Sequence, residues 1–180
     1  MSLIYSYGPG DGETVSESTV LPEGSSVSPR TQKLVDAERN TLDNDGCVIR
    51  LAGLYTLERG AHSYWLERGD GTVKGDEGGI INLLNYDDAA GSCMAALVKG
   101  MNSSIGNKIC LVSDGHPTTR RGICESALKS KRYGGFTMPT FLGSELKTGK
   151  GKIYDGSWTN EFLDWKPMYS SFDEFMANSQ

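Results

Sequence analysis

Three short motifs contain residue types that could do chemistry, and each also has a simpler structural interpretation. The glycine-rich stretch 8–12 follows an apolar stretch, as a dinucleotide-binding loop does, but acidic residues follow where a helix should begin. Ser126 and Lys129 have the spacing of a Ser-x-x-Lys nucleophile pair, which is common by chance on exposed helix faces. Asp87 and Asp88 lie at a helix start, where carboxylates cap free N–H groups. These motifs predict no catalytic set.

Metal ligands and reactive thiols are equally sparse. The two histidines, His62 and His116, are predicted to be exposed, and the separated cysteines do not have zinc-ligand spacing, so we expect no metal site. The cysteines lie mostly beside apolar residues, which indicates reduced, buried thiols in an intracellular protein, cytoplasmic or organellar. They are Cys47, Cys93, Cys110 and Cys124.

Composition excludes several partner classes. The chain has 180 residues, a net charge of −5 and a pI near 5.1, which argues against a nucleic-acid or anionic-membrane surface. No apolar run approaches the roughly 20 residues of a membrane span. The N-terminus has no secretory signal pattern. We therefore expect no nucleic-acid or membrane partner.

The elements that must position any site alternate between strands and helices. Apolar runs predict strands at 2–7, 47–52, 80–84 and 107–113, and residues 8–28 are predicted to be a long loop. Helices are expected at 28–42, 62–68, 87–99, from Thr118 or Thr119 to about 131, and from the capping box Ser171-x-x-Glu174 onward. The helix at 87–99 carries its apolar side chains on one face, which is typical of a core-facing helix. They are Ala90, Met94, Leu97 and Val98.

This alternation predicts an α/β layered fold with a mostly parallel sheet. The tail is more irregular and looks like a small lobe packed on the end of the sheet. Residues 48–55 read V-I-R-L-A-G-L-Y, a run typical of a buried parallel strand that needs neighbours.

The order of four sequence blocks resembles a known family. V-I-R-L-A-G-L-Y is followed by I-I-N-L-L-N-Y-D-D-A-A, then by I-C-L-V-S-D-G-H-P-T-T-R-R, and finally by E-F-L-D-W-K-P-M-Y-S-S-F-D-E-F. This succession resembles the C-terminal half of extended short-chain dehydrogenases/reductases, the NAD-dependent epimerase/dehydratase family, and is most similar to its atypical members. The resemblance implies a partial Rossmann-like, doubly wound and mostly parallel sheet domain over residues 1–115 and a small mixed α/β lobe of the substrate-binding type over residues 116–180. It also implies an NAD(P)-dependent protein acting on a nucleotide sugar.

Two features of that family are missing here. The N-terminal unit with the glycine-rich dinucleotide loop is not in this chain. The helix that resembles the family's Tyr-x-x-x-Lys helix has Arg30 and Leu34 at those two positions when Glu38 anchors the comparison. Neither residue can act as the family's acid/base pair. We therefore assign no catalytic residue and expect that this chain alone does not bind NAD or NADP.

The resemblance implies a small set of binding residues. Gly53, Leu54 and Tyr55 correspond to the backbone that approaches the nicotinamide, although Gly53 is equally well explained as a strand-end turn. Asn82 and Asn85 lie in a block at the substrate pocket, with Asn85 where a histidine is usual. Arg59 could face an anionic substrate or simply be solvated.

Three functional alternatives follow. The chain is the C-terminal half of an NAD(P)-dependent epimerase/dehydratase-like protein, a non-catalytic NAD(P)-fold binding or scaffold protein, or a truncated inactive product. Because the strands at 47–52 and 2–7 would have an unpaired edge and an uncovered apolar face, we also expect marginal solubility or self-association.

Overall fold

The computed structural model describes residues 10–20, 28–143 and 150–179, so the strand predicted at 2–7 lies outside the described residues. Within them the strands form five pairs, four parallel and one, β5 with β8, antiparallel. The pairs are β1 (Asp11–Val15) with β10 (Gly151–Tyr154), β2 (Cys47–Leu51) with β7 (Lys108–Val112), β3 (Gly53–Tyr55) with β6 (Leu83–Asn85), β4 (Thr72–Val73) with β9 (Thr140–Phe141), and β5 (Ile80–Ile81) with β8 (Thr118–Thr119). The fold is α/β and its strand pairs are mostly parallel, as the alternation predicts.

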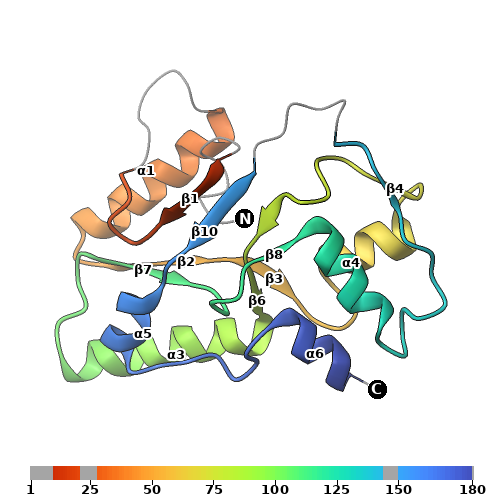
Figure 1. Ribbon diagram of the computed structural model, residues 1–180. Coiled ribbons are helices and arrows are strands. Elements are labelled where there is room, and N and C mark those ends of the chain that lie inside the picture. Colours follow the sequence, from red (N-terminus) through yellow and green to blue (C-terminus); the bar gives the residue numbers. More distant parts are fainter. Residues whose placement is uncertain (1–9, 21–27, 144–149, 180) are drawn as a thin grey trace.

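The helices lie on both sides of the strands. Figure 1 shows α1 on one side of β2 and β7 and α3 on the other, with α4 and α6 next to each other. The helices are α1 (Pro29–Asp43), α2 (Ala61–Ser63), the π-helical turn η2 (Tyr64–Arg68), α3 (Tyr86–Asn102), α4 (Arg120–Leu128), α5 (Ser157–Leu163) and α6 (Phe172–Asn178).

Local sequence explains where several helices begin. The Ser28 hydroxyl accepts a hydrogen bond from the Thr31 N–H at 3.1 Å, and Pro29 follows in the first turn. Thr119 caps α4, and Ser171 accepts from the Glu174 N–H at 3.1 Å at the start of α6. These three caps are confirmed.

The strand at 47–55 changes partner at Ala52. The Ala52 N–H donates to the Val112 carbonyl at 2.9 Å, whereas the Gly53 N–H donates to the Asn82 carbonyl at 3.0 Å. The run therefore forms two short strands, β2 against β7 and β3 against β6. The apolar run 80–84 is likewise split, because Asn82 separates β5 from β6.

The prediction of one long loop at residues 8–28 is wrong, because β1 lies within it. This segment has no alternating apolar pattern of its own. It becomes a strand by pairing in parallel with β10, which is distant in sequence.

The apolar face predicted for α3 does not face the core. Met94 is 59% exposed, Leu97 64% and Val98 51%, and Ala90 is also exposed. Small side chains form the buried face instead and let the helix lie close to the strands. The buried residues of α3 are Asp88, Ala89, Ser92 and Ala96.

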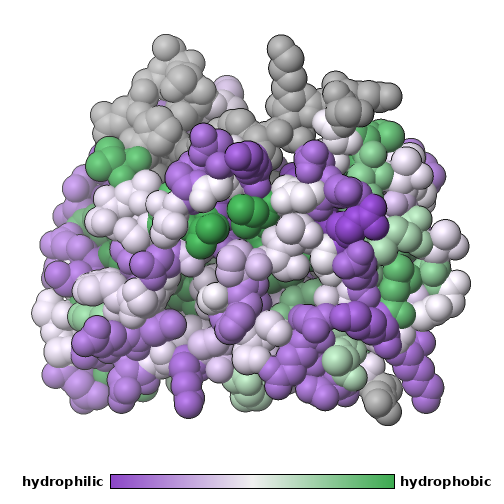
Figure 2. Space-filling model, in the orientation of Figure 1, coloured by the Kyte–Doolittle hydropathy of each residue, from purple (hydrophilic) through white to green (hydrophobic). Residues whose placement is uncertain are grey.

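The core is built around the central strands. One cluster contains Leu84, Leu111 and Val112, which are fully buried, with Tyr154 and Val15 from the β1–β10 pair. On the face seen in Figure 1, Figure 2 shows mainly hydrophilic and intermediate residues with small hydrophobic patches between them. In the part of the chain that the structure describes, no helix is long and apolar enough to cross a membrane.

Candidate functional site

A groove of about 720 Å³ lies between α1 and the strands β2 and β3. Leu34, Ala37 and Thr41 of α1 line one wall, and residues 47–54 line the other. The described strand partners of β2 and β3 are β7 and β6. The groove is therefore bounded by a helix face and by two strands that each have one described neighbour.

A buried ion pair connects the two walls of the groove. Arg50 Nε donates to Glu38 Oε1 at 3.1 Å and Arg50 Nη2 donates to Glu38 Oε2 at 2.7 Å, with side chains 3% and 14% exposed. Arg50 Nη1 has no hydrogen-bond partner among the described residues. The pair fixes α1 against β2, and its carboxylate is already committed to the guanidinium.

The structure separates the three residues predicted to meet the cofactor. Gly53 and Leu54 line the groove, whereas the Tyr55 ring is 1% exposed and packs edge-on against Phe172, with ring centroids 4.9 Å apart. Gly53 lies at the start of β3, and a Cβ atom there would come 3.1 Å from the Asn82 carbonyl oxygen. A side chain at this position would crowd the neighbouring strand.

The three predicted substrate residues have different surroundings. Arg59 is exposed, and its guanidinium lies 5.5 Å from the ring centroid of Tyr86, which lines the groove. Asn82 donates to the Lys152 carbonyl at 2.7 Å and accepts from the Tyr154 N–H at 2.9 Å, which holds β10.

Asn85 is 3% exposed and caps α3 by accepting the Asp87 N–H at 2.8 Å. The groove therefore brings Gly53 and Leu54 together, and Arg59 lies beside it, over the ring of the lining residue Tyr86. Asn82 and Asn85 instead satisfy backbone groups outside it.

The helix positions that the family resemblance compares with the tyrosine and lysine are also placed. Leu34 lines the groove and Arg30 is exposed. Leu34 contributes no titratable group to the wall at the position where the resemblance expects an ammonium. The groove can therefore contact an apolar or planar group, but its α1 wall offers no acid or base other than the paired Glu38.

A second, polar cluster lies at the carboxyl ends of β3, β6 and β7. Asp114 lies two residues beyond the end of β7, is 4% exposed, and accepts the His116 N–H through Oδ1 at 2.9 Å. Within the described ranges, neither Asp114 Oδ2 nor the Tyr55 hydroxyl has a hydrogen-bond partner. Burial raises the pKa of Asp114 to about 7, partly offset by the N–H and imidazole of His116. Burial and the charges of Asp114 and Asp88 also raise the pKa of Tyr55.

Asp88 belongs to the same cluster and has a role that the sequence did not reveal. It is 3% exposed and accepts the backbone N–H groups of Met168 at 2.6 Å and Tyr169 at 3.2 Å. The sequence predicts only capping at α3, and Asn85 is the N-cap. The signal for Asp114 was an acidic residue directly after an apolar parallel strand, where α/β folds place polar groups.

The prediction that His62 is exposed is wrong, whereas His116 is exposed as predicted. His62 is 1% exposed, its Nε2 lies 3.0 Å from the Leu57 carbonyl oxygen, and its ring packs against Tyr133 and Phe172. Burial lowers its pKa. Aromatic residues distant in sequence enclose it, so the local pattern could not show its burial.

Cysteines and acidic residues add no further centre. Cys110 and Cys124 are buried free thiols, whereas Cys47 and Cys93 are half-buried, so the expectation of four buried thiols holds for two of them. In the described ranges, no three His, Cys, Asp or Glu residues are grouped so that they could hold a metal ion.

Comparisons with known proteins identify the fold. No protein-family model matches the sequence, and no curated protein matches it. Among solved structures, MoeE5 in complex with UDP-glucuronic acid and NAD matches with a TM-score of 0.74 and 16% identity. The match covers 99% of this chain and 61% of that chain.

Two further structures match over 97% of this chain. A functionally unknown conserved protein from Silicibacter pomeroyi has a TM-score of 0.70 and 20% identity, and 64% of its chain is covered. dTDP-glucose 4,6-dehydratase from Bacillus anthracis in complex with NAD has a TM-score of 0.70 and 15% identity, with 57% covered. This chain thus spans about three fifths of the length of these structures, and over that length it shares their Rossmann-like fold.

Proposed function

We propose that this chain is the substrate-side part of an NAD(P)-dependent nucleotide-sugar epimerase/dehydratase-like protein, with Gly53 and Leu54 at the nicotinamide end of its site. The observation that carries the proposal is the groove, because it places these two residues together on a wall beside the helix that resembles the family's catalytic helix. Similarity of fold to structures that contain NAD and UDP-glucuronic acid supports it.

The groove suits only one end of such a cofactor. Gly53 has no side chain, so a planar ring can approach its backbone closely, and the apolar wall of Leu34 and Leu54 suits the face of a ring. When bound, the cofactor supplies hydride transfer. Two helix starts, Ala61 of α2 and Tyr86 of α3, line the groove, but within the described ranges no glycine-rich loop precedes either of them as a pyrophosphate site requires. We therefore expect the isolated chain to bind NADH weakly at most and to be inactive.

Titration of the full chain with NADH tests this proposal. Calorimetry should detect no micromolar site, and amide NMR at millimolar NADH should perturb the signals of Gly53 and Leu54 and of neighbouring groove residues. Gly53→Val, which fills the close approach, should abolish these perturbations, whereas Gly135→Val, at an exposed turn away from the groove where an added Cβ meets no atom, should retain them. Micromolar binding, or perturbations confined to another surface, would overturn the proposal.

A non-catalytic binding or scaffold role is the second candidate, and Leu34 favours it. An apolar residue occupies the groove position where the resemblance expects the lysine that contacts the ribose. Leu34→Lys separates the two candidates. If the groove retains a cofactor-type shape, the added ammonium should strengthen the NADH perturbations at Gly53 and Leu54. If the groove serves only as a scaffold, the variant should leave them unchanged.

A further inference from the structure

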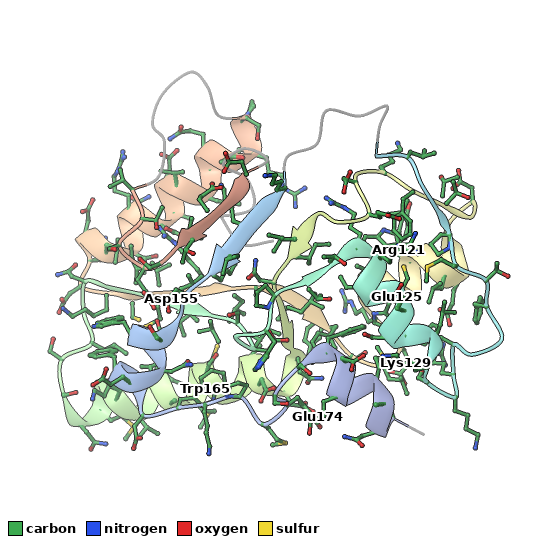
Figure 3. All side chains as sticks on the ribbon, viewed as in Figure 1. Arg121, Glu125, Lys129, Asp155, Trp165 and Glu174 are labelled. Atoms are coloured by element: carbon green, nitrogen blue, oxygen red, sulfur yellow. The ribbon has the colours of Figure 1, made fainter. Side chains whose placement is uncertain are left out.

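The C-terminal segment crosses the carboxyl ends of β3 and β6, where α/β folds usually bind ligands. We define residues 165–178, which end with α6, as the strap. Figure 3 shows Trp165 beside α3 and Glu174 on α6, so the strap follows α3 and then turns toward α4. The Trp165 indole lies against Gly91, and Phe172 and Met176 are 2% and 0% exposed.

Two buried carboxyl groups lie beneath this strap and differ in how they are satisfied. Asp88 accepts two strap N–H groups, those of Met168 and Tyr169. Asp114 Oδ1 accepts the His116 N–H, and the Phe172 N–H of the strap also faces this carboxyl group, but Oδ2 has no hydrogen-bond partner in the part of the chain that the structure describes. A buried carboxylate with an unsatisfied oxygen is costly, and protonation removes that cost.

The groups that face Asp114 come from every element around it. His116 lies on the same loop, Asp88 on α3 and Tyr55 on β3, and the backbone N–H of Phe172 comes from the strap. Tyr169, also on the strap, faces the Tyr55 hydroxyl. His116 and the Phe172 N–H favour the ionised carboxyl, whereas burial and Asp88 oppose it.

We propose that the strap is a pH-sensitive cover, which stays closed over the polar cluster while the Asp114 carboxyl is protonated and opens more readily once that carboxyl is ionised. Opening hydrates Asp114 and exposes the Tyr55 hydroxyl, while the β2–β7 core stays folded. Asp88 holds the strap through the N–H groups of Met168 and Tyr169. The device is independent of any cofactor in the groove.

The direction of the effect follows from proton linkage. Closed, Asp114 has a pKa raised to about 7; open and hydrated, it returns to about 4. The closed form therefore binds one more proton between these values, so closure is fully favoured below about pH 4 and weakens up to about pH 7. The opening equilibrium should rise by at most about tenfold per pH unit in that window and level off above it.

Hydrogen exchange of the full chain tests the proposal. Exchange of strap amides, corrected for intrinsic rates, should accelerate by roughly 30- to 100-fold from about pH 5 to about pH 8, whereas amides of β7 should not. Asp114→Asn keeps the acceptor for the His116 N–H and cannot ionise, so it should remove the pH dependence. Asp88→Asn should increase opening at every pH and retain the slope.

A titration of the wild-type Asp114 carboxyl carbon by NMR keeps the test decisive if Asp114→Asn fails to fold. Its midpoint should lie near neutral pH and coincide with the point where strap exchange levels off. A midpoint below about pH 5, an equal slope in Asp114→Asn, or equal acceleration of strap and β7 amides would each overturn the proposal.

Discussion

The groove and the strap-covered cluster handle buried charge in opposite ways. In the groove, the Arg50 guanidinium donates to the Glu38 carboxylate through two of its nitrogens, so each buried group faces an opposite charge. Beneath the strap, Asp114 forms no ion pair with any residue that the structure describes, and burial raises its pKa to about 7. A cationic partner compensates the charge of a buried carboxylate, whereas burial without such a partner raises the pKa of the carboxyl group.

The two regions also differ in what closes them. The groove is bounded by helix α1 and by the strands β2 and β3, and each of these strands has one described neighbour. The polar cluster is covered by α6, whose Phe172 and Met176 are almost completely buried. We expect substitutions in the groove to weaken the packing of α1 against β2, and substitutions in the polar cluster to weaken the packing of the strap.

Glu38→Ala should have the largest effect, because it leaves the Arg50 guanidinium buried without its counter-charge. We expect the free energy of unfolding to fall by about 3–5 kcal/mol in urea denaturation at neutral pH. Replacing both residues, as Glu38→Leu with Arg50→Met, should restore most of the loss. A loss below about 1 kcal/mol in the single variant would mean that the pair behaves like a solvated surface pair.

Asp88→Asn should rank second, because the amide oxygen replaces a carboxylate that accepts two strap N–H groups. Hydrogen bonds to charged groups contribute about 1.5–3 kcal/mol, and we expect a loss in that range. Asp87→Asn is the matched control, because Asp87 is exposed on the same helical turn. This substitution should lower the free energy of unfolding by only about 0.3–1 kcal/mol. Equal losses would show that Asp88 acts on α3 alone.

The sequence predicted those parts of the fold that local patterns determine. Ser28, Thr119 and Ser171 are caps because a hydroxyl must precede free N–H groups, and that requirement is visible in the sequence. β1 could not be predicted, because it depends on β10. The buried face of α3 could not be predicted either, because small residues there let the helix approach the strands closely.

The candidate site was predictable to a similar degree. The resemblance identified Gly53 and Leu54, and the groove brings them together. Asp88 and Asp114 were not identified as a cluster, because only folding brings α3, the end of β7 and the strap together. The role of Asn82 as a clamp on β10 likewise depends on residues distant in sequence.

Self-association should be weaker by about tenfold or more in Val48→Lys, if the edge of β2 is the contact surface. A lysine on an edge strand opposes pairing with another chain, and a tenfold change corresponds to about 1.4 kcal/mol. Sedimentation equilibrium measures it. Met101→Lys is the control, because Met101 is 86% exposed on α3, away from the groove. A wild-type monomer at all concentrations, or loss of association only in Met101→Lys, would show that the prediction is wrong.

Tyr55→Phe should have the smallest effect and the opposite sign. The variant removes a buried hydroxyl that has no partner among the described residues and keeps the ring contacts with Phe172 and Phe175. Because an unsatisfied buried hydroxyl costs free energy, we expect stability to be unchanged or to rise by up to about 1 kcal/mol. Urea denaturation at about pH 5 and about pH 8 distinguishes the cases. A loss of about 1 kcal/mol at both would mean that the hydroxyl is satisfied in solution, and a loss only at the higher pH would mean that it donates to ionised Asp114.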